Sequence, residues 1–128
     1  AHRRIARIEA RGGVRDAQAK LDADPALAAA VRETHARYAE ERDAALPAEA
    51  RYRPSGGVGG SSGSVKCLHA HYADFAAGND NPVGRDVAAQ IGEPRCASPC
   101  VRFIDGELRR NPDWHEPSQG PSDDAPQD

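Results

Sequence analysis

Five side chains in this sequence could ligate a metal ion or take part in thiol chemistry: Cys67, His69, His71, Cys96 and Cys100. Cys67 and His71 lie four residues apart, so in a helix both would project from one face. Cys96 and Cys100 flank a proline-containing turn that can direct two thiolates toward a common point. Three thiolates and one imidazole form the ligand set of a structural zinc site. The spacing therefore predicts a zinc site made of Cys67, His71, Cys96 and Cys100.

The same residues allow other interpretations. The cysteines can be small buried apolar residues with ordinary histidines beside them. Cys67, near the start of a helix, could be a nucleophile with His69 or His71 as its base. Cys96 and Cys100 could instead form a disulfide. His69 lies at the edge of the apolar side of the expected helix, so we expect it to pack in the core rather than bind metal.

A glycine-rich loop over residues 55–64 precedes the Cys67 helix. Backbone amides of such a loop, leading into a helix N-terminus, can hold a phosphate or another anion. The residues that would form this anion site are Gly56, Gly57, Ser64 and Lys66. The loop is not a Walker A loop, because Lys66 does not follow a glycine directly and no hydrophobic strand comes before it. A flexible linker and an ordered loop packed against the Cys67 helix are the alternatives.

The first helix carries a basic stripe, with Arg3, Arg7 and Arg11 on one face. Glu9 and Asp16 dilute this charge, and the sequence pI is only about 5.9. Modules that bind nucleic acid usually carry a basic excess over the whole domain. We therefore expect a solvated face and no nucleic-acid partner.

The elements that must position these residues are helices. Ala1 to about Leu46 reads as two or three helices, interrupted at Gly12-Gly13 and restarted at Asp24-Pro25, a good cap and first turn. A further helix is expected from Val65 to about Ala77, capped by Ser64. The last two expected elements are a short helix that opens at Asn81-Pro82 and ends at Gly92, and a hairpin whose strands meet across Asp105-Gly106.

These elements predict a mainly α fold: a small helical domain with a glycine-rich loop, a short C-terminal hairpin and a disordered acidic tail. We expect one domain over residues 1–117 and the tail over 118–128. The core is thin, because Val, Ile, Leu and Phe together number only 18 residues, about 14% of the chain. A metal, a protein partner or an upstream segment would add stability. The chain contains no methionine, so we expect that an upstream segment is missing.

The expected location of the protein and its expected partners rest on features that the sequence lacks. No stretch approaches the roughly 20 apolar residues that span a bilayer, and no signal-peptide core is present. Three cysteines, an odd number, argue against the closed disulfide framework of a secreted protein. We expect a cytoplasmic protein with a protein partner and no membrane span.

The run Val65-Lys66-Cys67-Leu68-His69, preceded by Gly56-Gly57 and followed by Asn81-Pro82-Val83-Gly84, resembles an actinobacterial family, domain of unknown function 501. The family has no established activity, so the resemblance implies relatives rather than a reaction. It also implies an upstream segment with a Thr-Cys-Pro run, which would add another cysteine. Family genes often lie beside those of a septum-formation initiator and an exopolyphosphatase, which implies a link to cell division or polyphosphate.

Overall fold

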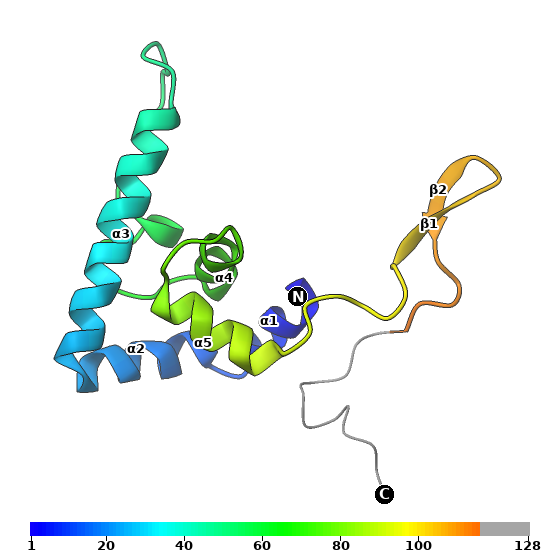
Figure 1. Ribbon diagram of the computed structural model, residues 1–128, viewed down its shortest axis with the longest axis horizontal. Helices are drawn as coiled ribbons and strands as arrows, with labels where there is room; N and C mark the ends of the chain where they lie inside the picture. Colours follow the sequence, from blue (N-terminus) through cyan, green and yellow to red (C-terminus); the bar gives the residue numbers. More distant parts are fainter. Residues whose placement is uncertain (116–128) are drawn as a thin grey trace, which may run out of the picture.

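The computed structural model describes residues 1–115, and the expected acidic tail at 118–128 lies outside them. The chain is mainly α, as predicted (Figure 1). The helices are α1 His2–Ala10, α2 Gly13–Ala23, α3 Pro25–Ala45, the 3₁₀ turn η1 Val58–Gly60, α4 Leu68–Ala76 and α5 Pro82–Ile91. The strands β1 Val101–Ile104 and β2 Glu107–Arg110 form one antiparallel hairpin.

The helix boundaries that depend on local signals fall where the sequence predicts them. The Asp24 carboxylate accepts the backbone N–H groups of Ala26 and Leu27 at 3.0 and 3.1 Å, with Pro25 in the first turn of α3. The Asn81 side chain caps α5 in the same way. Gly12, with φ of 89°, separates α1 from α2. Each signal satisfies backbone groups that a helix end leaves free.

The start of α4 is a correction to the sequence prediction. The helix was expected at Val65 with Ser64 as its cap, but it begins at Leu68, and Cys67 is an extended N-cap residue (φ −144°, ψ 113°). Distant side chains hold the preceding backbone extended: Val65 N–H donates to Gln18 Oε1 at 3.0 Å. Cys67 and His71 therefore do not share a helical face.

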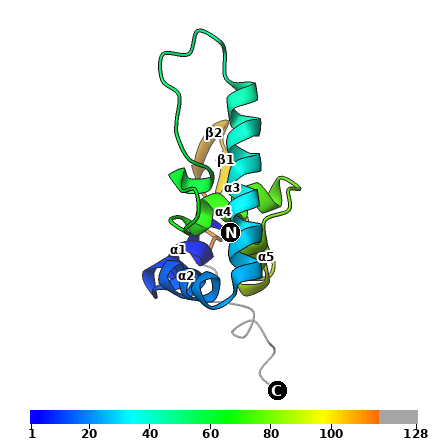
Figure 2. The same ribbon diagram turned by 90° about the vertical axis from the view of Figure 1, so that its left-hand side faces the viewer.

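The core lies where α1, α2 and α3 meet α4 and α5. In Figures 1 and 2, α3 forms one side of the body, α2 crosses one end of α3, and α4 and α5 pack side by side. Among the described residues the buried apolar cluster is small: Ile5, Leu21, Val31, Val65, Leu68, Val83, Val87 and Ile91. Val58, in η1, is also buried but lies outside this cluster. No helix within residues 1–115 is both long and apolar enough to cross a membrane.

The hairpin projects from this helical body on the side away from α3 (Figure 1). Its strands pair Phe103 with Leu108 and Ile104 with Glu107 across the Asp105-Gly106 turn. Both turn residues have positive φ, 53° and 81°, as a two-residue hairpin turn with the correct twist requires.

The N-terminal residues contact the base of the hairpin arm, where Arg4 of α1 donates to the Glu93 carbonyl at 2.8 Å. The N-terminal ammonium group donates to the Pro94 carbonyl at 2.6 Å. The Arg3 guanidinium lies 5.0 Å from the centre of the Trp114 ring. The arm is therefore held at its base, whereas its strands extend beyond the helices (Figure 1).

Candidate metal centre

Three side chains from two distant segments meet beside the first turn of α4. Glu9 comes from the last turn of α1, Cys67 is the N-cap of α4, and His69 stands in its first turn. One carboxylate oxygen, the thiol sulfur and one ring nitrogen all lie within 4.8 Å of one another. We refer to Glu9, Cys67 and His69 as the metal-ligand group. Within the described chain, no other three His, Cys, Asp or Glu residues are grouped this closely.

The Glu9 carboxylate organises this group. Its Oε1 accepts the Leu68 backbone N–H at 2.7 Å, so Glu9 completes the N-terminus of α4 from outside the helix. Its Oε2 lies 3.1 Å from His69 Nδ1. The Glu9 and His69 side chains are 27% and 26% exposed, which leaves the group half-buried but accessible to an ion.

The contacts of His69 determine what can lie between it and Glu9. His69 Nε2 lies 3.1 Å from the His2 carbonyl oxygen, which can only accept, so Nε2 carries a proton and donates. In the neutral ring, Nδ1 then presents its lone pair to the Glu9 carboxylate. That contact is repulsive unless a proton or a metal cation lies between the two groups.

The donor set fits a borderline metal such as Zn²⁺. Thiolate, imidazole and carboxylate are its usual protein ligands, and tetrahedral ligands around it lie about 3.5 Å apart. The observed limit of 4.8 Å requires only a small closing movement of the side chains. The η1 loop reaches this site: a Cβ on Gly59 would lie 3.3 Å from the Cys67 Cβ.

The structure does not bring the four predicted ligands Cys67, His71, Cys96 and Cys100 together. His71 is fully buried, and its Nδ1 donates to Asn81 Oδ1 at 3.1 Å. Cys96 and Cys100 are exposed free thiols between α5 and β1. Cys67 lies outside α4 as its N-cap, and it is His69, not His71, whose ring nitrogen is grouped with the Cys67 sulfur within 4.8 Å.

His71 belongs instead to a buried polar network between α4, α5 and α3. Asn81 Nδ2 donates to Asp74, and Arg37 donates to the same carboxylate at 2.6 Å. Burial would raise the pKa of Asp74, but hydrogen bonds from Arg37, Asn81 and Asn79 outweigh it and hold the pKa below its ordinary value. Burial lowers the pKa of His71 despite the bond to Asn81, so this ring is neutral near pH 7.

His35, on α3, holds the glycine-rich loop in place. Its Nδ1 accepts the Val58 N–H at 3.0 Å, and its Nε2 donates to the Ser64 carbonyl at 3.0 Å. Burial lowers the pKa of His35 despite the bond to Ser64. A Cβ on Gly57 would lie 2.6 Å from the His35 backbone, so only glycine allows this approach. The loop is thus a shaped element packed against α3 and the start of α4.

The residues predicted to hold an anion have structural partners. Gly57 N–H donates to the Ser61 carbonyl, Ser64 N–H donates to Ser61 Oγ, and the Gly56 carbonyl accepts from Arg42. Lys66 is exposed. Loop amides that an anion would need donate to the protein itself, so the loop geometry favours the packing role.

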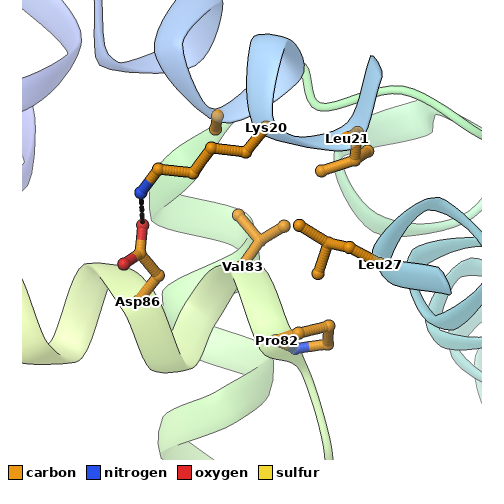
Figure 3. A pocket seen from close by; sticks show the side chains of 7 residues that line it. Lys20, Leu21, Leu27, Pro82, Val83 and Asp86 are labelled. Atoms are coloured by element: carbon orange, nitrogen blue, oxygen red, sulfur yellow. Dashed lines mark hydrogen bonds and ion pairs between the residues drawn. The ribbon is translucent and has the colours of Figure 1, made fainter. Parts of the chain in front are cut away.

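A small cavity lies between α2, α3 and α5, away from the metal-ligand group (Figure 3). Leu21, Leu27 and Val83 line it with apolar side chains, and the Lys20–Asp86 ion pair, 2.9 Å long, crosses one side. Its volume of about 160 Å³ is below the range of typical small-molecule sites. We assign no ligand to it.

Glu9 was not singled out from the sequence, and His69, which was expected to pack in the core, lies half-buried beside Glu9. Glu9 lies 58 residues before Cys67 and appeared only as an acid diluting an arginine stripe. Its one local signal is that it is the sole acid among the first 15 residues. His69 was assigned to packing because α4 was expected to start three residues earlier.

The part of the chain that contains Glu9, Cys67 and His69 matches a known protein family. Neither the curated proteins nor the solved structures include a match to this chain. A family match covers residues 1–89, which include Glu9, Cys67 and His69 and end before Cys96, Cys100 and the hairpin. The chain therefore belongs to the family described as protein of unknown function (DUF501).

Proposed function

We propose that this chain is a metal-stabilised domain that binds one Zn²⁺ ion through Glu9, Cys67 and His69. The observation that carries the proposal is the convergence of a thiol, an imidazole and a carboxylate within 4.8 Å of one another. The ligands come from α1 and from the start of α4, so a bound ion would cross-link two segments that lie far apart in the sequence.

The hydrogen bonds around the ligands support this assignment. Metal-bound histidines usually donate their second ring N–H to a carbonyl or carboxylate, which fixes the tautomer and the ring orientation. The His69 Nε2–H···O bond to His2 has this form and leaves Nδ1 directed at Glu9. The Leu68 N–H plays the same orienting part for Glu9. A reducing compartment such as the cytoplasm keeps Cys67 available as a thiolate ligand.

The thin core gives the ion a physical role. Among residues 1–115, eight apolar side chains form the buried cluster. Ion binding that requires the folded arrangement adds directly to the folding free energy. The geometry gives no comparable support to thiol catalysis, because both ring nitrogens of His69 face Glu9 and His2 rather than Cys67. Three protein ligands leave a fourth position for water or an exogenous ligand.

Zinc binding is tested on protein produced without a histidine tag, stripped with chelator and then titrated with Zn²⁺. We expect about one zinc per chain by native mass spectrometry and a higher melting temperature, since zinc at 100 times its Kd stabilises by about 2.7 kcal/mol. Less than about 0.1 zinc per chain, with unchanged melting, would contradict the proposal.

Matched variants separate the two ligand sets. Cys67→Ser and Glu9→Gln remove a ligand with little change in size, and both should lose most of the zinc-induced rise in melting temperature. Cys96→Ser and Cys100→Ser should keep it, because these thiols lie outside the group. Loss of zinc in the Cys96 and Cys100 variants would favour the ligand set predicted from spacing.

A further inference from the structure

Among the residues that the structure describes, the hairpin has no third strand at either edge. One of its faces carries exposed apolar side chains. Val101, Phe103 and Leu108 are 46%, 74% and 63% exposed. The register places these three side chains on the same face, together with Arg110. A two-stranded hairpin is marginally stable alone, so an apolar face of this kind needs a cover.

The backbone of β2 is oriented to accept another strand. Asn111 N–H donates to the Cys100 carbonyl, so Asn111 faces β1. Backbone groups in an antiparallel pair alternate between the two edges. Arg109 and Glu107 therefore also face β1, whereas the N–H and C=O groups of Leu108 and Arg110 point to the outer edge of β2.

We propose that β2 pairs with β2 of a second copy of this chain, antiparallel and centred on Leu108. A two-fold axis through this point sets Leu108 opposite Leu108 of the second copy, where the outward N–H and C=O groups of the two residues can bond to each other. Both apolar faces then lie on the same side of a four-stranded sheet. The apolar cross-strand pair of Phe103 and Leu108 then lies next to the same pair of the second copy.

The charges of β2 select this partner and this register. Within one strand, Arg109 Nη2 pairs with Glu107 Oε2 at 2.8 Å. With Leu108 at the centre, Glu107 of each copy also lies opposite Arg109 of the other, so two further pairs of opposite charge form across the strands. A register centred on Glu107 would oppose two glutamates, and one centred on Arg109 would oppose two arginines. The strand is therefore complementary to itself in a single register that also joins the apolar faces.

The first test is the mass of the full chain in solution, measured by sedimentation equilibrium in reducing buffer so that Cys96 and Cys100 form no disulfides. We expect a concentration-dependent monomer–dimer equilibrium. A mass that stays monomeric up to about 0.5 mM would overturn the proposal, because even weak specific association, with Kd near 0.1 mM, is detected there.

Charge reversal tests the register. Glu107→Arg and Arg109→Glu each replace two attractive pairs by two repulsive ones, so each variant alone should dimerise at least about tenfold more weakly. An equal mixture of the two variants restores opposite charges at every pair, and it should form a mixed dimer as tightly as the wild type. Failure of the mixture to associate would overturn this register.

Two proline variants identify the edge. Leu108→Pro removes an N–H that points to the outer edge of β2 without removing a bond of the β1–β2 ladder, and it should abolish the dimer. Val101→Pro does the same at the outer edge of β1 and should leave the dimer intact. The reverse result would move the interface to β1 and contradict the proposal. Glu40→Arg, an equal charge change on α3, controls for net charge and should have no effect.

Discussion

At the scale of single residues, His69 and His71 lie in surroundings that differ from those expected: His71 is buried in a polar network, and His69 is half-buried beside Glu9. Only Ala70 separates the two residues, so on a helix one side chain faces the interior when the other faces outward. Which of them is buried depends on where α4 begins, and Glu9 and Gln18 determine that start from 59 and 47 residues away. The order of residues along the chain does not reveal these long-range contacts. It does show that a thiol and two imidazoles lie near the start of α4.

The buried histidines make stability depend on pH. Burial lowers the pKa values of His35 and His71 below 6.5, so as pH falls through 6.5 the unfolded chain takes up protons before the folded chain does. Stability is then lost with falling pH, on the order of 1 kcal/mol for each histidine between pH 7 and 5.5. Asp74 acts in the same direction at lower pH: because its pKa is lowered, its contribution to stability is present above about pH 3.8 and is lost as the pH falls below that value.

Urea unfolding followed by circular dichroism at pH 7.5, 6.5 and 5.5 measures this effect. Chelator is added so that metal release does not contribute. An unfolding free energy that is equal at pH 7.5 and 5.5 would contradict the assignment of His35 and His71 as buried neutral rings.

At the scale of elements, caps and turns were predictable and close packing was not. Asp24-Pro25, Asn81-Pro82 and Asp105-Gly106 act on neighbouring backbone groups, so each signal is complete within a few residues of sequence. The contact between α4 and α5 is different, because it depends on Gly84 lying directly against the backbone of His71. A Cβ on Gly84 would lie 2.2 Å from the His71 carbonyl oxygen and 2.6 Å from the Phe75 Cβ.

Gly84→Ala should therefore separate α4 from α5 and destabilise the protein by about 2 kcal/mol or more, the cost of overpacking at a rigid contact. The gain in helix propensity, at most about 1 kcal/mol, does not offset this cost. Gly63→Ala is the matched control, since its nearest neighbour would be Arg32 Cγ at 3.8 Å. Thermal unfolding of the two variants compares them, and equal melting temperatures would show that the α4–α5 contact yields easily.

At the scale of the whole molecule, the chain joins a thinly packed helical body to a projecting hairpin. The mainly α class, the hairpin and the shortage of core residues were all predictable, because composition, periodicity and turn residues carry them. Of Glu9, Cys67 and His69, only the thiol and the imidazole could be singled out from the sequence, since α1 brings Glu9 to Cys67 through tertiary packing. The part of the chain that matches the family contains this group entirely, whereas the hairpin lies beyond it.

The central claim is that Cys67, with Glu9 and His69, binds a metal. Titration with Co²⁺, which replaces Zn²⁺ in such sites and gives an absorption band when a thiolate binds it, tests this directly. We predict a thiolate-to-cobalt band that saturates at about one Co²⁺ per chain, disappears in Cys67→Ser and persists in the Cys96→Ser/Cys100→Ser double variant. A band that persists in Cys67→Ser, or no band in the wild-type chain, would contradict the account.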